Sequence, residues 1–251
     1  MNSTQTLEQK AKKIRKDILD MSMKYNDGHI APSFSIVEIL VALYFRILKE
    51  NDKLILSKGH SCLALYTALM ELGYCPTISG HPDIQVCEGI HCTTGSLGHG
   101  LPIGVGMAFA KKLKKEKGHV YVVMGDGECQ EGTIWESMNL AQRYKLDNLT
   151  AIIDFNKFQA LTTIKDVMNE TEHSLKSKFK AFGCNVIMSA GHNVKELADK
   201  LGSKTIVKDT PRVIIADTVK GKGISFMEND PKWHSRLPKG DELKQAYEEL
   251  R

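Results

Sequence analysis

Along the first third of the chain, apolar residues recur at the spacing of an α-helix. In the stretch 7–25 they occupy positions 7, 11, 14, 18 and 21, which form one stripe, and the stretch ends at Asn26-Asp27-Gly28, a typical helix stop. Two further helices are predicted at about 35–48 and 62–72. Loops rich in Gly, Pro and His follow from 73 to 100. This part of the chain is therefore expected to be mainly helical.

Beyond residue 100 the pattern changes to helices that alternate with short β-branched runs. Helices are predicted at 101–116, 131–144, 173–181 and 194–201, with a surface helix at 240–251. Strands are predicted at 119–124, 149–154, 185–189 and 212–218. An irregular polar stretch separates the second strand from the helix that follows it. Such alternation is typical of an α/β fold with a parallel β-sheet and helices on both faces.

Three of the predicted strands end in polar residues. The strand ends read Gly125-Asp126-Gly127-Glu128, Asp154-Phe155-Asn156 and Asp217-Thr218-Val219-Lys220, the last leading into "KGKG". In open parallel sheets, ligands bind beyond the carboxyl ends of the strands. We therefore expect the chemistry of this protein to lie along that edge.

Asp126 and Asn156 are the strongest candidates for ligands of a metal ion. They stand 30 residues apart, and one helix and one strand fill the interval, so both side chains should reach adjacent strand ends. Mg²⁺ prefers oxygen ligands and often shares them with phosphates, and the flanking glycines and the next helix N-terminus would admit a diphosphate. The alternative is a Gly-Asp-Gly turn with an Asx bond, and Asn156 as a cap. A nicotinamide fingerprint fits poorly, because the glycines are spaced GxGxxxxG.

Composition narrows the classes of protein. The 251 residues allow a substantial core, and 42% hydrophobic with 25% charged residues is ordinary for a soluble globular protein. The net charge of +4 and the absence of a basic stripe interleaved with aromatics argue against a nucleic-acid partner. The one basic run, 111–118, is interpreted as the solvated end of a helix.

Cysteine spacing and hydropathy point to the cytoplasm. The six cysteines form no CxxC pair, which argues against zinc. The first 20 residues contain no apolar signal core. The most hydrophobic window, 36–48, is shorter than a membrane span and is interrupted by Glu38 and Arg46. We expect free thiols, no membrane partner and a cytoplasmic location.

Outward from Asp126 and Asn156, the sequence resembles the N-terminal half of a transketolase. Asp126-Gly127 followed by Asn156 matches the spacing of the thiamine diphosphate motif GDG…N. The blocks "YNDGHIAPS", "LSKGHSCLALYTAL", "GHPD", "TTGSLGHGL", "DTVKGKGISFMEND" and "KWH" follow in family order from about residue 25 to 236. The resemblance implies the thiamine-diphosphate-binding fold, with 1–251 as a single domain for the diphosphate end of the cofactor.

The resemblance also implies roles for individual residues toward thiamine diphosphate. Asp126, Asn156 and the backbone carbonyl of Phe158 would hold Mg²⁺ or another divalent cation such as Ca²⁺ or Mn²⁺. The remaining cofactor-binding positions would be Lys58, His60, Gly95, Ser96, Leu97, Gly127, Glu128, Lys220 and His234. Within this set, Gly127, Lys220 and His234 would face the diphosphate, and the backbone of 95–97 would contact the aminopyrimidine ring. The loop 159–172 departs from the family pattern.

Histidines and one glutamate are the catalytic candidates that the resemblance implies. His29, His60 and His81 would line the channel to the reactive carbon, His234 would act beside the diphosphate, and Glu131 would communicate across a dimer interface. Imidazole is suited to this role, because the reaction must move protons near neutral pH. The other histidines, at 91, 99, 119, 173 and 192, are interpreted as surface or structural residues.

What the chain lacks relative to a full transketolase implies a partner. The domain that binds the aminopyrimidine is missing, so we expect it, together with the C-terminal domain, on a C-terminal transketolase subunit, in an α₂β₂ heterotetramer. The starting Met and the terminal "YEELR" favour a natural chain over a fragment. The expected activity is transfer of a two-carbon ketol unit from a ketose (phosphate) to an aldose (phosphate) through a carbanion on thiamine diphosphate.

Two other functions remain open at this point. The diphosphate-binding subunit of a 2-oxo acid decarboxylating enzyme would share GDG…N but not His29, His60 and His81. A non-catalytic regulator of the same fold would be free to lose the metal and histidine positions, all of which are present.

Overall fold

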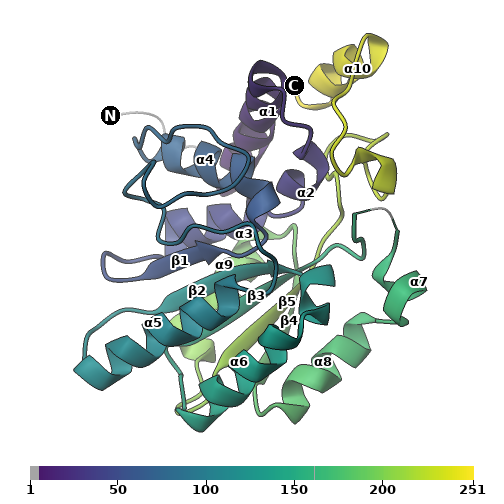
Figure 1. Cartoon of the computed structure of the whole chain (residues 1–251). Helices are drawn as coiled ribbons and strands as arrows, with labels where there is room; N and C mark the ends of the chain where they lie inside the picture. Colours follow the sequence, from purple (N-terminus) through teal and green to yellow (C-terminus); the bar gives the residue numbers. More distant parts are fainter. Residues whose placement is uncertain (1–5, 161) are drawn as a thin grey trace.

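A parallel β-sheet forms the centre of the molecule (Figure 1). In this computed structural model, residues 6–160 and 162–251 are described, so the first five residues and Leu161 of the 159–172 loop lie outside the description. The sheet has five strands in the order β1-β2-β3-β5-β4. Their bounds are Lys53–Leu56 (β1), Val120–Gly125 (β2), Leu149–Phe155 (β3), Asn185–Ala190 (β4) and Arg212–Asp217 (β5). The predicted α/β class and parallel sheet are confirmed.

Helices cover both faces of the sheet (Figure 1). One face carries α1 (Leu7–Tyr25), α2 (Ile30–Phe34), α3 (Val37–Ala42), α4 (Cys62–Glu71) and α9 (Val194–Leu201). The other face carries α5 (Gly100–Lys114), α6 (Gly132–Arg143) and α8 (Glu172–Ala181). Alternate residues of one strand serve the two layers: Tyr121 and Val123 of β2 pack in the first cluster, and Val122 and Met124 pack in the second. Period-two side-chain direction therefore divides the core into two halves.

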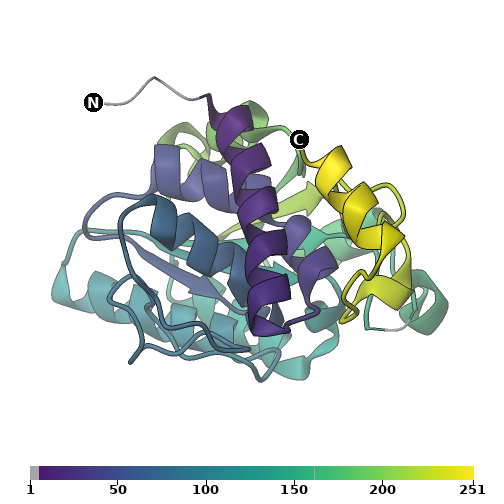
Figure 2. The ribbon, with the colours of Figure 1, turned by 90° about the horizontal axis from the view of Figure 1, so that it is seen from above.

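Local signals account for several helix boundaries. Thr6 and Gln9 form a capping box at the start of α1, and Asn26 ends the helix in a left-handed conformation with φ 55°. The predicted C-terminal helix is present as α10 (Asp241–Glu249). It lies alongside α1 (Figure 2), where the Tyr247 hydroxyl donates to Asp20 at 2.8 Å.

Two features of the N-terminal third differ from the prediction. Strand β1 was not predicted, because four residues between two helices are too short to show a period; it pairs with β2 and delivers Ser57 and Lys58 to the sheet edge. The predicted helix at 35–48 is α2, α3 and a π-helical turn at Leu43–Ile47 in succession. The segment Ile30–Ile47 is long and apolar enough to pass for a membrane span by composition, with mean hydropathy 1.7, but 78% of it is buried in the fold. It is packed here as a core segment.

The polar strand ends meet at one edge of the sheet, as expected. Gly125 of β2 is in register with Asp154 of β3, and Phe155 is in register with Asp217 of β5. Beyond β3, the stretch predicted to be irregular contains an isolated bridge between Phe158 and Thr163 and the short helix α7 (Ile164–Met168). Three consecutive strands therefore present their carboxyl ends to the same space.

Candidate active site

A cavity of about 290 Å³ lies at the carboxyl ends of β2 and β3. Many of the predicted site residues line it: Lys58, His60, Leu97, Asp126, Gly127, Glu128, Glu131, Asn156, Phe158 and His234. The amide nitrogens of Gln130 and Gln159, which line the same cavity, are buried without a hydrogen-bond partner in the described part of the chain. Buried donors of this kind require a partner, so the lining is suited to a polar ligand.

Asp126 is a buried carboxylate that faces neutral donors. It is 2% exposed and accepts hydrogen bonds from the backbone N–H groups of Gly127 at 2.7 Å and Lys157 at 2.5 Å. Burial, reinforced by the negative charge of Asp154, raises the pKa of Asp126 to about 7 despite those bonds. A cation bound at this carboxylate would reverse the penalty, which fits the predicted metal site.

Asn156 is oriented by Asp154, the acid two residues before it. The Asn156 amide nitrogen donates to Asp154 at 2.8 Å, while its oxygen accepts from the backbone N–H of Phe158 at 3.0 Å. This arrangement turns the amide oxygen away from Asp154. An oxygen ligand for a metal is therefore held in place by a neighbouring carboxylate, as outer hydrogen bonds commonly do at metal sites.

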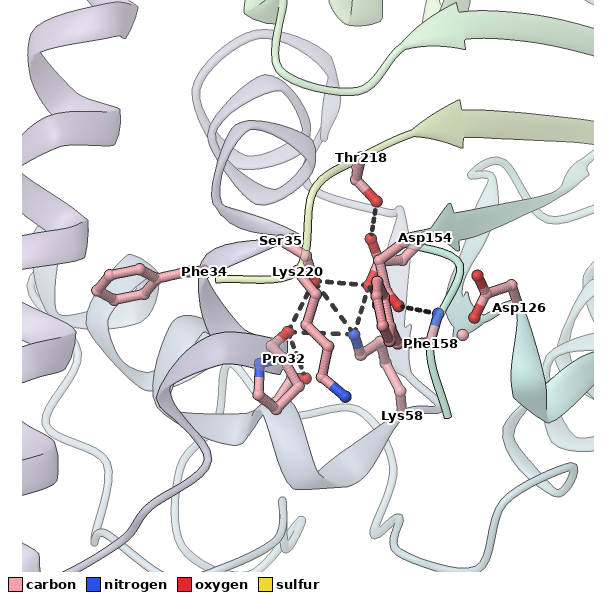
Figure 3. A network of polar contacts seen from close by, with 12 residues as sticks. Pro32, Phe34, Ser35, Lys58, Asp126, Asp154, Phe158, Thr218 and Lys220 are labelled. Carbon is pink, nitrogen blue, oxygen red and sulfur yellow. Dashed lines mark hydrogen bonds and ion pairs between the residues drawn. The ribbon is translucent and has the colours of Figure 1, made fainter. Parts of the chain in front are cut away.

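Asp154 itself is the centre of a fully buried polar cluster (Figure 3). Besides Asn156, its carboxylate accepts from Lys58 Nζ at 2.5 Å, Ser35 Oγ at 2.7 Å and Thr218 Oγ1 at 2.5 Å. Burial acts to raise the pKa of Asp154, but the Lys58 charge and these hydrogen bonds outweigh it and hold the pKa below its usual value. The sequence placed Asp154 at a strand end but gave it no role; the signal that identifies it is the one that identified Asp126, an acid ending an apolar strand.

Glu128 forms a second buried polar centre. Its carboxylate accepts from the Ser57 hydroxyl and from the backbone N–H groups of Gly98 at 2.8 Å and Gly125 at 3.2 Å. Burial raises the pKa of Glu128, and these donors oppose the rise. Gly98 has φ +81°, and a Cβ there would lie 2.7 Å from the Glu131 Cβ, so only glycine fits. Glu128 thus ties the Asp126 turn to the loop that carries 95–97.

Three histidines gather beside the cavity. The ring centroids of His29, His60 and His234 lie 5.4–5.9 Å apart. His29 donates from Nδ1 to Asp27 at 2.8 Å. Burial and then the nearby Lys58 charge lower the pKa of His60 to about 2, and burial with the Lys220 charge lowers that of His234 to about 4. Both imidazoles are therefore neutral at physiological pH.

Lys220 lies behind His234 rather than in the cavity lining. It is 1% exposed, and its ammonium donates to the Gln159 carbonyl at 2.8 Å and to His234 Nδ1 at 3.0 Å. Burial, followed by repulsion from Lys58, lowers its pKa to about 8. Because Lys220 donates to Nδ1, the proton of His234 is on Nε2, which leaves an N–H donor for a ligand.

The remaining predicted residues lie around the rim. His81 is exposed, and its ring packs over Gly59 and Gly95, so it stands apart from the three clustered histidines. Ser96 and Leu97 are exposed on the loop before α5, and Glu131 is exposed at the start of α6. These positions are open to a further chain or to the rest of a cofactor.

The histidines interpreted as structural or surface residues have varied surroundings. His91 Nδ1 accepts from the Leu54 N–H at 3.2 Å, and His119 bonds Thr150 at 2.7 Å. His99 and His173 are exposed. His192 contacts both Glu38 and the backbone of Val219. Within the described residues, no group of three His, Cys, Asp or Glu side chains is arranged to hold a metal.

Residues 6–250 match the transketolase thiamine diphosphate binding domain. This chain belongs to the transketolase family. One of the two chains of the apulose-4-phosphate transketolase from Actinobacillus succinogenes is 41% identical over 98% of this chain and 96% of its own length. The 6-deoxy-6-sulfo-D-fructose transketolase subunit of a Clostridium species is 37% identical over 97% of this chain and 96% of its own.

Solved transketolase structures share the fold. The crystal structure of transketolase from Campylobacter jejuni superposes with a TM-score of 0.86 at 29% identity, covering 100% of this chain and 43% of that protein. The chain thus spans less than half of a full-length transketolase and nearly all of the split subunits. It is an N-terminal, diphosphate-binding transketolase subunit of the split type, part of a thiamine diphosphate-dependent transferase, and the decarboxylating and non-catalytic alternatives are not favoured.

Proposed function

We propose that this chain joins a C-terminal transketolase subunit, forming a complex that transfers a two-carbon ketol unit from a ketose to an aldose. The observation that carries the proposal is the buried carboxylate of Asp126, which shares one cavity with Asn156, Phe158 and two neutral histidines. Those groups supply the two functions that the reaction needs from this half: anchoring of a metal–diphosphate and movement of protons.

The divalent cation would be held by Asp126, Asn156 and the backbone carbonyl of Phe158. The raised pKa of Asp126 supports this assignment, because a buried carboxylate that faces only neutral donors gains most from a cation. The orientation of the Asn156 amide by Asp154 supports it as well. Mg²⁺ is the expected ion, with Ca²⁺ or Mn²⁺ as substitutes, since all the proposed ligands are oxygens.

Thiamine diphosphate would lie along the same cavity. Gly127 would lie against its diphosphate, the Nε2–H of His234 would donate to it, and Lys220 would supply positive charge from behind. Lys58, His60 and Glu128 would support this end, the last two through ring contact and loop position, and the backbone of 95–97 would contact the aminopyrimidine. When bound, the cofactor supplies the carbanion that carries the two-carbon unit.

His29, His60 and His81 would handle the protons of substrate hydroxyl and carbonyl groups. A neutral imidazole can accept a proton or donate one through its N–H, and the lowered pKa of His60 keeps that ring neutral. His29 is oriented by Asp27, and exposed His81 would meet the substrate near the entrance. The substrates would be sugars or sugar phosphates, since the named relatives include an apulose-4-phosphate and a sulfofructose transketolase.

The working assembly would be an α₂β₂ heterotetramer. The chain would form a single domain over 1–251 that holds the diphosphate end, and the partner would bring the pyrimidine-binding and C-terminal domains. Exposed Glu131 would then couple two sites across a subunit interface. We also propose a cytoplasmic location, which the six free cysteines support.

Mild affinity purification of the tagged chain, with Mg²⁺ and thiamine diphosphate present throughout, tests the proposal. The expected result is a co-purifying chain of about domain size, bound thiamine diphosphate, and a native mass of an α₂β₂ complex. Ketol transfer by that complex should require both chains and should be lost on Asp126→Ala. A lone dimer without cofactor, or full turnover of the Asp126→Ala complex, would contradict the proposed function.

A further inference from the structure

A buried ion pair lies behind the loop that carries Lys220. Arg15 of α1 forms a bidentate pair with Glu38 of α3, with both nitrogen–oxygen distances at 2.6 Å. The side chains of Arg15 and Glu38 are each 8% exposed. Neither residue contacts the cavity described above, and such a pair is weak evidence for stability by itself. Its other contacts are therefore informative.

Those contacts reach the backbone on either side of Lys220. His192, in the turn after β4, accepts the Val219 N–H at its Nε2 at 2.8 Å, and its Nδ1 lies 2.9 Å from Glu38 Oε2. Arg15 Nε donates to the Lys222 carbonyl at 2.9 Å. One network thus grips the residue before Lys220 and the residue two beyond it.

The bonding pattern fixes the tautomer of His192. Because Val219 N–H can only donate, Nε2 must be the acceptor, and the proton is then on Nδ1, where it donates to Glu38. The turn can approach β5 this closely because residue 191 is glycine: a Cβ there would lie 2.6 Å from the Asp217 carbonyl oxygen. Every donor and acceptor of the imidazole is therefore used to hold the loop.

We propose that Arg15, Glu38 and His192 form a clamp that positions Lys220, and that the His192–Val219 hydrogen bond is its decisive contact. The clamp acts through Lys220 on His234 and on the Gln159 carbonyl, the two groups that the Lys220 ammonium contacts. His192, Glu38 and Arg15 are thus positioning residues for the diphosphate end of the site. This inference rests on the proposed function, in which Lys220 serves the diphosphate.

Two substitutions at His192 separate the two contacts of its ring. His192→Asn keeps a donor near the position of Nδ1 but removes the acceptor for Val219, whereas His192→Gln places an amide oxygen near Nε2 and restores that acceptor. The full-length chain is titrated with inorganic diphosphate in the presence of Mg²⁺ by calorimetry. Exchange of the Val219 amide hydrogen is followed in parallel, and His173→Asn, on exposed α8, is the matched control.

The clamp predicts that His192→Asn weakens diphosphate binding by about three- to tenfold, the effect of losing one hydrogen bond. It also predicts faster exchange at Val219, while His192→Gln and His173→Asn stay within about twofold of wild type. The double variant His192→Asn/Lys220→Met should bind no more weakly than Lys220→Met alone, because both act through the same side chain. Arg15→Lys, which keeps the charge beside Glu38 but loses the Nε donor to Lys222, should weaken binding as well and serves if His192→Asn does not fold.

Two results would overturn the clamp, and they differ in what else they overturn. If Lys220→Met weakens diphosphate binding but neither His192→Asn nor Arg15→Lys does, the clamp is wrong and the proposed function stands. If the wild-type chain and Lys220→Met bind diphosphate equally, Lys220 does not serve the diphosphate, and that part of the proposed function fails with the clamp.

Discussion

Replacing Asp154 by Asn tests the buried cluster under the cavity. The substitution keeps the size of the side chain but removes its charge, so the Lys58 ammonium, 2% exposed, loses its only carboxylate contact at 2.5 Å among the described ion pairs. An amide also offers one oxygen where the carboxylate accepts four donors. Ser35 and Thr218 can rotate their hydroxyls to accept from the new amide, but Lys58 and Asn156 can only donate.

The expected cost follows from the unpaired charge. Breaking a buried pair by removing one partner destabilises proteins by about 3–5 kcal/mol, and rotation of the two hydroxyls limits further loss. For a chain of this size, that corresponds to a fall in Tm on the order of 10 °C. Lys58→Met/Asp154→Asn removes both charges, so it should lose less than the single variant, with a coupling energy of about 2–3 kcal/mol.

Urea unfolding of the chain without cofactor measures these values directly. Asp217→Asn is the matched control, because Asp217 also ends a strand and pairs with Lys157 at 2.5 Å, yet both side chains are about half exposed, at 44% and 50%. Such an exposed pair contributes about 0–1 kcal/mol. If Asp154→Asn cost no more than Asp217→Asn, or if the double variant were less stable than Asp154→Asn, the buried charge would not govern this cluster.

Other residues give independent predictions. Asp126→Ala should weaken retention of thiamine diphosphate with Mg²⁺ by more than about 100-fold, since Asn156 alone cannot neutralise a cation; unchanged affinity by calorimetry would remove Asp126 from the metal site. His60→Ala should slow turnover of the reconstituted complex roughly 100-fold while changing cofactor affinity far less, and a defect confined to affinity would contradict a catalytic role. For Glu38, burial alone would raise the pKa, but Arg15 and His192 lower it to about 2 from 4.5. Because the folded pKa is depressed, this stabilisation of about 3 kcal/mol is complete above pH 4.5 and is lost as pH falls toward 2. Urea unfolding between pH 6 and 3 should therefore show an acid loss that Glu38→Gln reduces, and parallel profiles would refute it.

Much of the fold and the candidate site could be predicted from local sequence. Helical and alternating periodicities identified the main helices and four of the strands, because side-chain direction alone creates those patterns. The meeting of Asp126 and Asn156 was also predictable: in a parallel sheet every strand ends at the same edge, so residues one helix and one strand apart arrive together. Strand β1 escaped, because its four residues are too few to show a period.

Tertiary structure decided how those groups are used. Lys58 neutralises Asp154 and Glu128 is taken up by Ser57 and two backbone N–H groups, although their positions alone would equally allow contact with a ligand. The partners stand tens of residues apart in the chain, and His192, whose sequence gives no sign of a role, reaches Val219 only after β4 and β5 pair. Periodicity and strand ends depend on neighbours along the chain, so the sequence determines them. Hydrogen-bond partners, burial and the protonation of buried groups depend on neighbours in space, which only the packed sheet and its helices bring together.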